Sequence, residues 1–439
     1  MTTSTIERAV QSAPVATAAG DARSRVYPLI VFALTFGLLL SDYMSRQVLS
    51  AVFPFLKVEW ALSDTQLGAL TSVVALTVGL LAVPLSLLGD RWGRSKAIIA
   101  MATLWSLATL GSAVAANYEQ MMLARLFIGL GEAAYGSVGL AVVLMVFAPS
   151  KRASLTGAFM AGGSFGSVLG VFLGGILAVH LGWRWSFGVM AVVGLVLVLL
   201  YLLLVNDAKL LGNQHPGNAV AEPASATRQR ARLRTLVSTP SVVCAYLGSG
   251  LQLFVAGSLF AWLPSYLNRA YGLAPDRAGI AAAGFILLMG VGMIVCGVIT
   301  DRLTRTHPIR KWTTSLVYAS LSLALLPLGF AQDPGRLQLV LIAAGAFFAA
   351  GVSGPAGAMV ANLTPASIRA TAFGTLTLAN NLLGLAAGPV VVGLLADRLG
   401  LVDAMTIMPL VSVLAIVALL IGRRAYPSSV QRVSAVASS

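Results

Sequence analysis

The chain has 439 residues, of which 58% are hydrophobic and 10% charged, and its formal net charge is +14. Soluble domains carry roughly 25% charged residues, so this composition excludes an ordinary soluble fold and indicates that lipid surrounds most of the chain. A basic soluble protein would suggest a nucleic-acid partner, but these bases lie in short loops between apolar runs, as in membrane proteins, so we expect no nucleic-acid binding.

Twelve apolar runs follow one another along the chain, each long enough for the roughly 20 residues that a membrane-spanning helix needs. We predict an all-α integral membrane protein with twelve transmembrane helices in two pseudo-symmetric six-helix bundles. The expected helices are roughly 27–56, 64–88, 97–116, 120–148, 154–179, 185–205, 237–268, 276–300, 313–331, 337–363, 369–396 and 403–422. The bundles are then 27–205 and 237–422, joined by a polar linker at 206–236 and flanked by tails at 1–26 and 423–439.

The distribution of Lys and Arg predicts the orientation. The tails, the linker and the loops on their side hold 21 of these residues, whereas the opposite loops hold 6. Because basic loops stay in the cytoplasm, we expect both termini there. The first 26 residues lack an apolar core, so we interpret them as a tail and not as a signal peptide.

Two patterns each recur later in the chain, one after 211 residues and the other after 218, and indicate an internal duplication. A charged turn after the second run contains Asp90, Arg91, Gly93 and Arg94, and a weaker copy with Asp301, Arg302 and Arg305 follows 211 residues later. Small residues let helices approach closely in lipid, and the glycines of the fifth run recur in the eleventh. These glycines are Gly166, Gly170, Gly175 and Gly182, matched 218 residues later by Gly384, Gly388, Gly393 and Gly400.

Four ionisable side chains lie inside the predicted spans, all in the first half. Asp42 and Arg46 are four residues apart on the first helix, and Arg125 and Glu132 are seven apart on the fourth, so each pair shares a helix face. An ionisable group at this depth costs at least ~2.5–3.5 kcal/mol and needs a partner or a polar cavity. If the two helices meet, the four form a neutral set, which could serve either as an internal salt-bridge network or as a binding site.

As a binding site, this set suits proton-coupled movement of an organic anion. A carboxyl group in a low-dielectric cavity takes up a proton more readily, and we assign this role to Glu132 and Asp42. Arginine can bind a carboxylate through two parallel hydrogen bonds, and we assign this role to Arg46 and Arg125. Further candidates for contacting substrate are aromatic and amide residues, each of which could instead serve packing: Tyr43, Tyr135, Gln252, Tyr266, Asn380 and Asn381.

Enzymatic functions find little support in the sequence. No Gly-Lys dipeptide occurs, so a Walker phosphate loop is excluded. Cys244 and Cys296 lie inside apolar runs and are interpreted as packing residues. We therefore predict no enzymatic activity, no metal and no cofactor, with the proton gradient as the energy source.

The charged turn resembles the signature of the major facilitator superfamily, Gly-x-x-x-Asp-Arg-x-Gly-Arg-Arg/Lys, with Ser86 in place of the first glycine. Within that superfamily the chain resembles the bacterial spinster-like transporters, near the organic anion:cation symporters. This likeness rests on residues 41–47, 62–68, 125–134 and 182–187. It implies alternating access in a bacterial inner membrane and a cytoplasmic conformational latch. The latch residues would be Asp90, Arg91, Gly93, Arg94, Asp301, Arg302 and Arg305.

Two departures from the related patterns bear on function. The spinster-like signature of the first helix reads Asn-Tyr-x-Asp-Arg, whereas here Asp42 stands at the Asn position and Ser45 at the Asp position. The acid therefore lies about one turn earlier. Drug antiporters of the superfamily carry Gly-Pro on the fifth helix, whereas here Val171 follows Gly170.

We predict a monomeric secondary active transporter that couples protons to a small organic anion, a carboxylate, with the bilayer and the substrate as partners. The alternative is proton-coupled export of an amphipathic lipid, such as a lysolipid or a sphingoid-like molecule, or of a drug. A third hypothesis is a sensor or scaffold that keeps the fold without transport.

Overall fold

The computed structural model of the protein describes residues 18–215, 239–305, 307–364 and 368–438, and their regular structure is helical throughout. The first half contains α1 (Ala18–Glu59), α2 (Asp64–Trp92), α3 (Arg94–Val114), α4 (Tyr118–Glu132), α5 (Tyr135–Val146), η1 (Pro149–Lys151), α6 (Arg152–Leu181) and α7 (Trp183–Leu204). The short helix α8 (Asp207–Gly212) follows. The second half contains α9 (Pro240–Tyr271), α10 (Pro275–Thr304), α11 (Arg310–Phe330), α12 (Arg336–Ala349), η4 (Ala350–Val352), α13 (Ser353–Leu363), α14 (Arg369–Ala379), η6 (Asn380–Ala386), α15 (Ala387–Leu399), α16 (Leu401–Ile407), η7 (Met408–Leu410) and α17 (Val411–Ser438).

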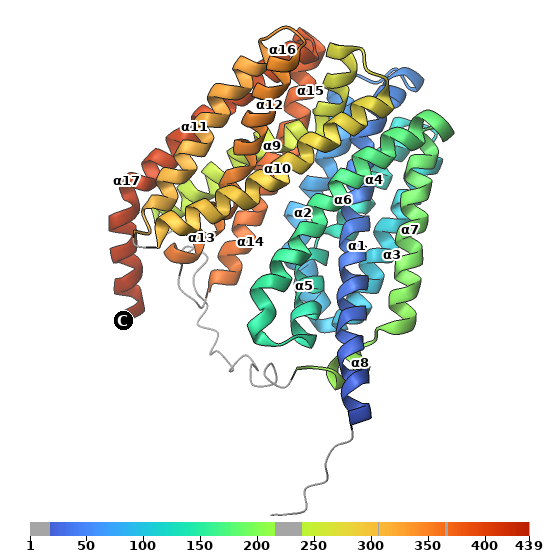
Figure 1. Ribbon diagram of the computed structural model, residues 1–439, viewed down its shortest axis with the longest axis vertical. Helices are drawn as coiled ribbons and strands as arrows, with labels where there is room; N and C mark the ends of the chain where they lie inside the picture. Colours follow the sequence, from blue (N-terminus) through green and yellow to red (C-terminus); the bar gives the residue numbers. More distant parts are fainter. Residues whose placement is uncertain (1–17, 216–238, 306, 365–367, 439) are drawn as a thin grey trace, which may run out of the picture.

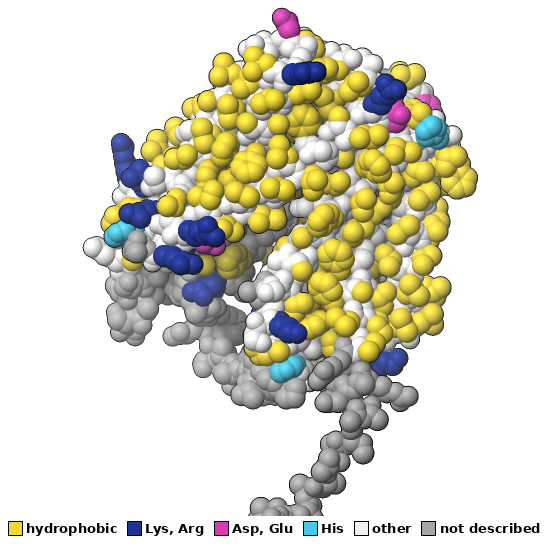
Figure 2. Space-filling view, in the orientation of Figure 1, with side chains coloured by type: hydrophobic (Ala, Val, Ile, Leu, Met, Phe, Trp, Pro, Cys, Tyr) yellow, Lys and Arg dark blue, Asp and Glu magenta, His cyan; other side chains and the backbone are white. Residues whose placement is uncertain are grey.

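Twelve helical segments in the described ranges are long and apolar enough to cross a membrane, which confirms the predicted all-α fold. Hydrophobic side chains cover the middle of the visible face, and charged ones gather toward its two ends (Figure 2). This distribution matches a bilayer, whose apolar core is bounded on both sides by water.

The helices form two bundles, α1–α7 and α9–α17, with α8 and the start of α1 at the same end of the molecule (Figure 1). We call this the linker-side end and the opposite end the far end. Each bundle packs around its own core, and a third apolar cluster joins both bundles.

The glycines that repeat in the sequence make equivalent contacts in the two bundles. On α6, Gly166 and Gly170 lie against the backbone of α1, and on η6 and α15, Gly384 and Gly388 lie against the backbone of α9. An added Cβ at any of the four would come within 3 Å of the facing helix. The duplication is therefore a property of the packing, because the same close approach recurs in both halves.

Two further glycines of the repeat join one bundle to the other at the far end. Gly175 on α6 meets the start of α10 at Pro275, and Gly393 on α15 meets the start of α2 at Asp64. Toward the linker-side end the halves separate. Gly157, near the start of α6, and Gly297, near the end of α10, both lie toward this end, and an added Cβ at either would meet nothing within 4 Å. Figure 2 shows a hollow between the bundles at that end. The far end is therefore closed and the linker-side end open.

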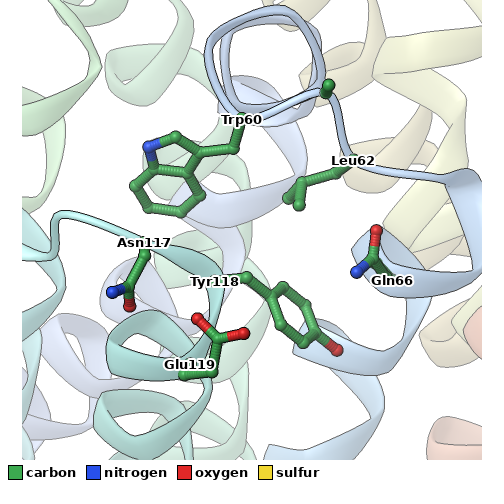
Figure 3. Close-up of a pocket in the computed structure, with 7 residues that line it drawn as sticks. Trp60, Leu62, Gln66, Asn117, Tyr118 and Glu119 are labelled. Carbon is green, nitrogen blue, oxygen red and sulfur yellow. The ribbon is translucent and has the colours of Figure 1, made fainter.

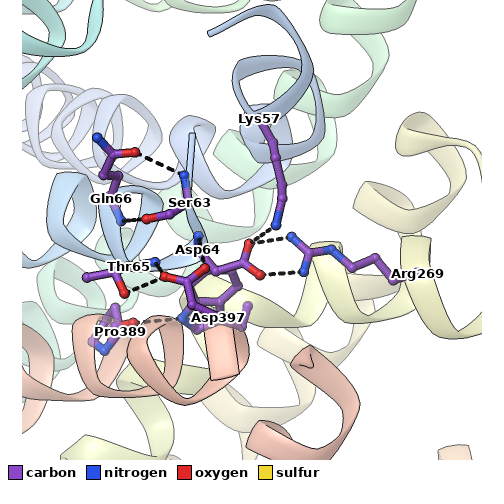
Figure 4. Close-up of polar contacts among 9 residues, drawn as sticks. Lys57, Ser63, Asp64, Thr65, Gln66, Arg269, Pro389 and Asp397 are labelled. Carbon is purple, nitrogen blue, oxygen red and sulfur yellow. Dashed lines mark hydrogen bonds and ion pairs between the residues drawn. The ribbon is translucent and has the colours of Figure 1, made fainter. Parts of the chain in front are cut away.

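Ion pairs close the far end across the two bundles (Figure 4). The Asp64 carboxylate, whose side chain is 4% exposed, accepts two hydrogen bonds from Arg269 of α9, at 2.6 and 2.8 Å. Lys57 of α1 donates a third, at 2.7 Å. The paired arrangement of the Arg269 guanidinium and the carboxylate is the strong, oriented form of this interaction.

Asp397, an acid of the second bundle, binds the start of α2. The Asp397 carboxylate on α15 accepts hydrogen bonds from the backbone N–H groups of Asp64, at 2.7 Å, and Thr65, at 2.9 Å, and from the Thr65 hydroxyl, at 2.6 Å. A carboxylate is stabilised at a helix N-terminus, where N–H groups lack partners. We call Lys57, Asp64, Arg269 and Asp397 the far-end lock.

The observed elements differ from the expected ones at several places, including the fourth span and the C-terminal tail. The fourth span breaks after Glu132, where Ala133 and Ala134 separate α4 from α5. The expected tail from residue 423 is instead helical, because α17 continues to Ser438. Its extension is held by packing, since the ring of Tyr426 lies 6.3 Å from that of Trp312 between centroids.

Gly393→Val should destabilise the closed far end. Its side chain would collide with the Asp64 carbonyl, and overpacking of this kind costs about 1–3 kcal/mol. We expect a lower apparent melting temperature of the purified protein in nanodiscs. Gly284→Ala on α10 is the matched control, because an added Cβ there meets nothing within 4 Å. Equal melting temperatures for the two variants would contradict the packing described above.

Arg269→Gln should open the far end more often than Lys57→Gln, although both remove a cation from the same carboxylate. Of the two ion pairs, only that of Arg269 with Asp64 joins one bundle to the other. A hydrogen bond to a charged group contributes about 1.5–3 kcal/mol. A cysteine at Ala396, a buried residue of α15, placed in a background without Cys244 and Cys296, reports opening through its rate of labelling by an impermeant maleimide. We expect a rise of about tenfold for Arg269→Gln. Identical labelling rates would show that the pair does not hold the bundles together.

Candidate functional site

The structure brings the four charged residues of the first half together. Arg46 of α1 and Glu132 of α4 form an ion pair across the bundle, with 3.3 Å between Nε and Oε2. The Glu132 side chain is 3% exposed and that of Arg46 18%. Burial removes both charges from water, so the pair is stable only if its remaining donors and acceptors also find partners.

Arg125 is fully buried on α4, two turns before Glu132. Its Nη1 donates to the backbone carbonyls of Ser45 and Arg46, both at 3.3 Å, and its guanidinium lies 5.2 Å from the centre of the Phe187 ring. Among the described residues, nothing accepts a hydrogen bond from its Nε and Nη2. A buried guanidinium with two free donor groups can donate to another acceptor.

Asp42 is buried beside Glu132, and the two carboxyl groups lie within hydrogen-bonding range of each other. Two carboxylates this close repel, whereas a single shared proton lets one donate a hydrogen bond to the other. Oδ1 of Asp42 and Oε1 of Glu132 have no other partner in the described part of the chain. The cluster therefore combines two cations, two acids and several free polar atoms.

The backbone is irregular next to this cluster. The break at Ala133 and Ala134 directly follows Glu132, and its equivalent 218 residues later falls on the 3₁₀ segment Ala350–Val352 of the tenth span. The eleventh span contains a π-helical segment, Asn380–Ala386. Irregular backbone within a membrane is tolerated where it lies inside protein or lines a cavity, and π segments occur frequently at functional sites.

The candidate residues of the second half are polar and only partly satisfied. Gln252 on α9 is 1% exposed, yet neither atom of its side-chain amide has a partner among the described residues. Asn381 donates from Nδ2 to the Thr377 carbonyl at 2.9 Å and leaves Oδ1 without a partner, and Oδ1 of the half-buried Asn380 is equally free. These amides supply hydrogen-bonding groups without adding charge.

The three tyrosines predicted to contact substrate have their rings packed between helices, and their role in binding stays a prediction. The Tyr135 ring lies 4.9 Å from that of Trp105, and its hydroxyl donates to the Thr35 carbonyl at 2.7 Å, which holds it inside the first bundle. Tyr266 is fully buried in the apolar cluster that joins the bundles, 4.9 Å from the Phe330 ring. Tyr43 is half-buried, with its ring against Gly163 of α6. Each tyrosine is explained by packing between helices.

The expected latch residues lie at the linker-side end, away from the cluster. Arg91, Asp301, Arg302 and Arg305 are exposed, and Nη1 of Arg94 lies 3.9 Å from the Met145 sulfur. Gly93 separates α2 from α3 at φ +97°. The side chain of Asp90 falls outside the described residues.

The linker supplies a contact that the sequence reasoning missed. Asp207 of α8 accepts a hydrogen bond from the Ser95 N–H at 2.9 Å, which ties the start of α3 to the segment after the sixth span. The far-end lock was missed as well, because Lys57 and Arg269 lie in predicted loops, where a basic residue indicates only the membrane orientation. Its one local signal is the capping box of Ser63 and Gln66, which marks the start of α2.

No three His, Cys, Asp or Glu side chains in the described ranges come together as a metal site would require. Two arginines and a pair of carboxyl groups can bind an anion and exchange a proton.

Comparison with known proteins places the chain in a family. The family model of the Major Facilitator Superfamily matches residues 35–331 and 245–437. An MFS-type efflux pump of Mycolicibacterium smegmatis is 28% identical, with 82% of each chain covered. Protein spinster homolog 1 of Xenopus laevis is 25% identical over 84% of this chain and 73% of its own length. A probable L-galactonate transporter of Escherichia coli is 26% identical over 81% of this chain and 80% of its own length.

The fold agrees with this placement. The crystal structure of a bacterial homolog of the human lysosomal transporter spinster, in an inward-facing and occupied conformation, matches with a TM-score of 0.80 at 18% identity. The match covers 92% of this chain and 98% of that one. The chain therefore belongs to the Major Facilitator Superfamily and is a membrane transporter rather than an enzyme.

Proposed function

We propose that the protein is a secondary active transporter that couples protons to the movement of a small organic anion by alternating access. The observation that carries this proposal is the buried cluster of Asp42, Arg46, Arg125 and Glu132, in which several donors and acceptors are unpartnered. Groups of this kind are expensive to bury and survive where they bind a substrate or an ion.

The charge of the cluster supplies the coupling. With both acids ionised, two cations face two anions and the set is neutral. One proton on the pair formed by Asp42 and Glu132 leaves a net charge of +1, which favours an anion near the free Nε and Nη2 of Arg125. Release of the anion and of the proton restores the neutral set. The second half contributes the uncharged amides of Gln252 and Asn381.

The membrane orientation follows from the loop charges. We propose that the linker-side end, where most Lys and Arg lie, faces the cytoplasm of a bacterial inner membrane. The closed far end and the hollow at the linker-side end then correspond to an inward-facing state. The far-end lock must break, and the linker-side end close, for the site to reach the other side.

The relative named as a probable L-galactonate transporter supports a small carboxylate as cargo. The relatives named as spinster homologs, and one named as a sphingosine-1-phosphate transporter in Danio rerio at 27% identity over 62% of this chain and 56% of its own length, support an amphipathic lipid. A lipid with an anionic head group could use the same arginines. A binding screen by thermal shift separates the two, since bound ligand raises the apparent melting temperature.

Glu132→Gln should abolish uphill accumulation of cargo driven by a proton gradient, whereas exchange of labelled for unlabelled cargo at equal pH should persist. The amide keeps the size of the side chain but cannot titrate. Arg125→Gln should lose both activities, because it removes an anion-binding group. Flux into proteoliposomes, with L-galactonate as the first probe, measures both. Undiminished gradient-driven uptake by Glu132→Gln would remove this residue from the mechanism.

Asp42→Asn should also weaken gradient-driven accumulation, by about tenfold or more, if the two carboxyl groups share the proton. The double variant Asp42→Asn/Ser45→Asp moves the acid one turn along the same helix, still beside Arg46, and should recover part of the coupling. Asp333→Asn, an exposed acid of a far-end loop, is the control for a change of charge alone. Undiminished coupling in Asp42→Asn would show that Glu132 carries the proton alone and does not share it with Asp42.

A further inference from the structure

A pocket lies at the far end of the first bundle, apart from the charged cluster. Its volume is about 380 Å³, within the range of small-ligand pockets. It is formed by the loop between α1 and α2, the first turn of α2 and the start of α4 (Figure 3). The lining residues are Trp60, Ala61, Leu62, Gln66, Asn117, Tyr118 and Glu119.

The chemistry of this far-end pocket favours a cation. The side chains of Trp60, Tyr118 and Glu119 lie around one space, so two aromatic rings and a carboxylate are available to the same ligand (Figure 3). No described residue donates a hydrogen bond to the Glu119 carboxylate or forms an ion pair with it. The faces of Trp and Tyr rings attract cations.

Neighbouring basic residues are already engaged with other acids. Lys57 is paired with Asp64 at 2.7 Å, and Arg184 is paired with Glu59 at 2.9 Å. A carboxylate in the first turn of a helix can serve the helix dipole alone. That role gives no reason for two aromatic rings to border the same cavity.

An anion is disfavoured because the start of α4 offers it few donors. The Asn117 side chain accepts from the Gln120 N–H at 2.9 Å, and the Gln120 side chain accepts from the Ala116 N–H at 2.9 Å. These N–H groups are therefore satisfied within the protein. The side chain of Glu119 would also repel a bound anion.

The loop in the wall of the pocket carries backbone strain. Ala61 has φ +49° and is the only non-glycine residue with a positive φ in the described part of the chain. Strained positions of this kind cluster at ligand clamps and switch regions. The loop leads directly into Ser63 and Asp64, so a ligand here would contact the segment that carries the far-end lock.

We propose that the far-end pocket is a binding site for a small organic monocation, an ammonium or quaternary ammonium group, held by Glu119 between Trp60 and Tyr118. This site is independent of the anion cluster and differs from it in the sign of the charge it selects. It lies at the opposite end of the first bundle from the linker-side opening.

The test is calorimetric titration of the full chain in nanodiscs with benzyltrimethylammonium. Benzyl alcohol, which presents the same ring without the cation, serves as the matched probe. We expect heat of binding with the cation only. Glu119→Gln should weaken that binding by about fivefold, and the double variant Glu119→Gln/Tyr118→Leu should weaken it further.

Two control variants keep the result specific. Asp333→Asn removes an exposed acid of another far-end loop and should leave the affinity unchanged. Glu132→Gln should also leave it unchanged, so failure of the proposed transport mechanism and failure of this site are distinguishable. Equal binding of benzyltrimethylammonium and benzyl alcohol, or unaltered affinity in Glu119→Gln, would overturn the proposal.

Discussion

The burial of two guanidinium groups inside a bundle surrounded by lipid is the constraint on which the site depends. Arg125 is fully buried and the Arg46 side chain is only 18% exposed, and neither can lose its charge to escape the cost of leaving water. Their charges need acids and carbonyls within the same bundle, and α1 and α4 supply both. The pairing of Arg46 with Glu132 and the bonds of Arg125 to the α1 backbone therefore hold these helices in register as well as forming the site.

The scaffold is symmetric, but its chemistry is not. The same glycine contacts join α6 to α1 and the eleventh span to α9, and both the fourth and the tenth spans deviate from regular helix at equivalent points. The charged residues of the central cluster nevertheless all come from the first half, and the second contributes amides such as Gln252. A duplicated frame lets the halves rock against each other, while the charged groups of the central cluster all belong to one of them.

The two ends of the molecule are governed by different interactions. At the far end, Asp64 and Asp397 draw together elements of both bundles through partly buried ion pairs and helix-terminal N–H groups. Glycines next to them allow the backbones to approach closely enough for these short contacts. At the linker-side end such contacts are missing between the described parts of α6 and α10, so the halves diverge there. The cleft between the bundles is therefore open at the linker-side end and closed at the far end.

The sequence alone determined the number of spans, the duplication and the four charged residues of the first half, because long apolar runs, a fixed repeat and charges inside such runs are local signals. Only the tertiary structure decided which atoms meet. Helical spacing aligns Asp42 with Arg46, but the pairing of Arg46 with Glu132 depends on how α1 packs on α4. Tyr135 could not be placed from its spacing, since its hydroxyl bond to the Thr35 carbonyl is made across the bundle. The far-end lock joins residues more than 200 positions apart, and contacts of that range follow from packing and not from any pattern along the chain.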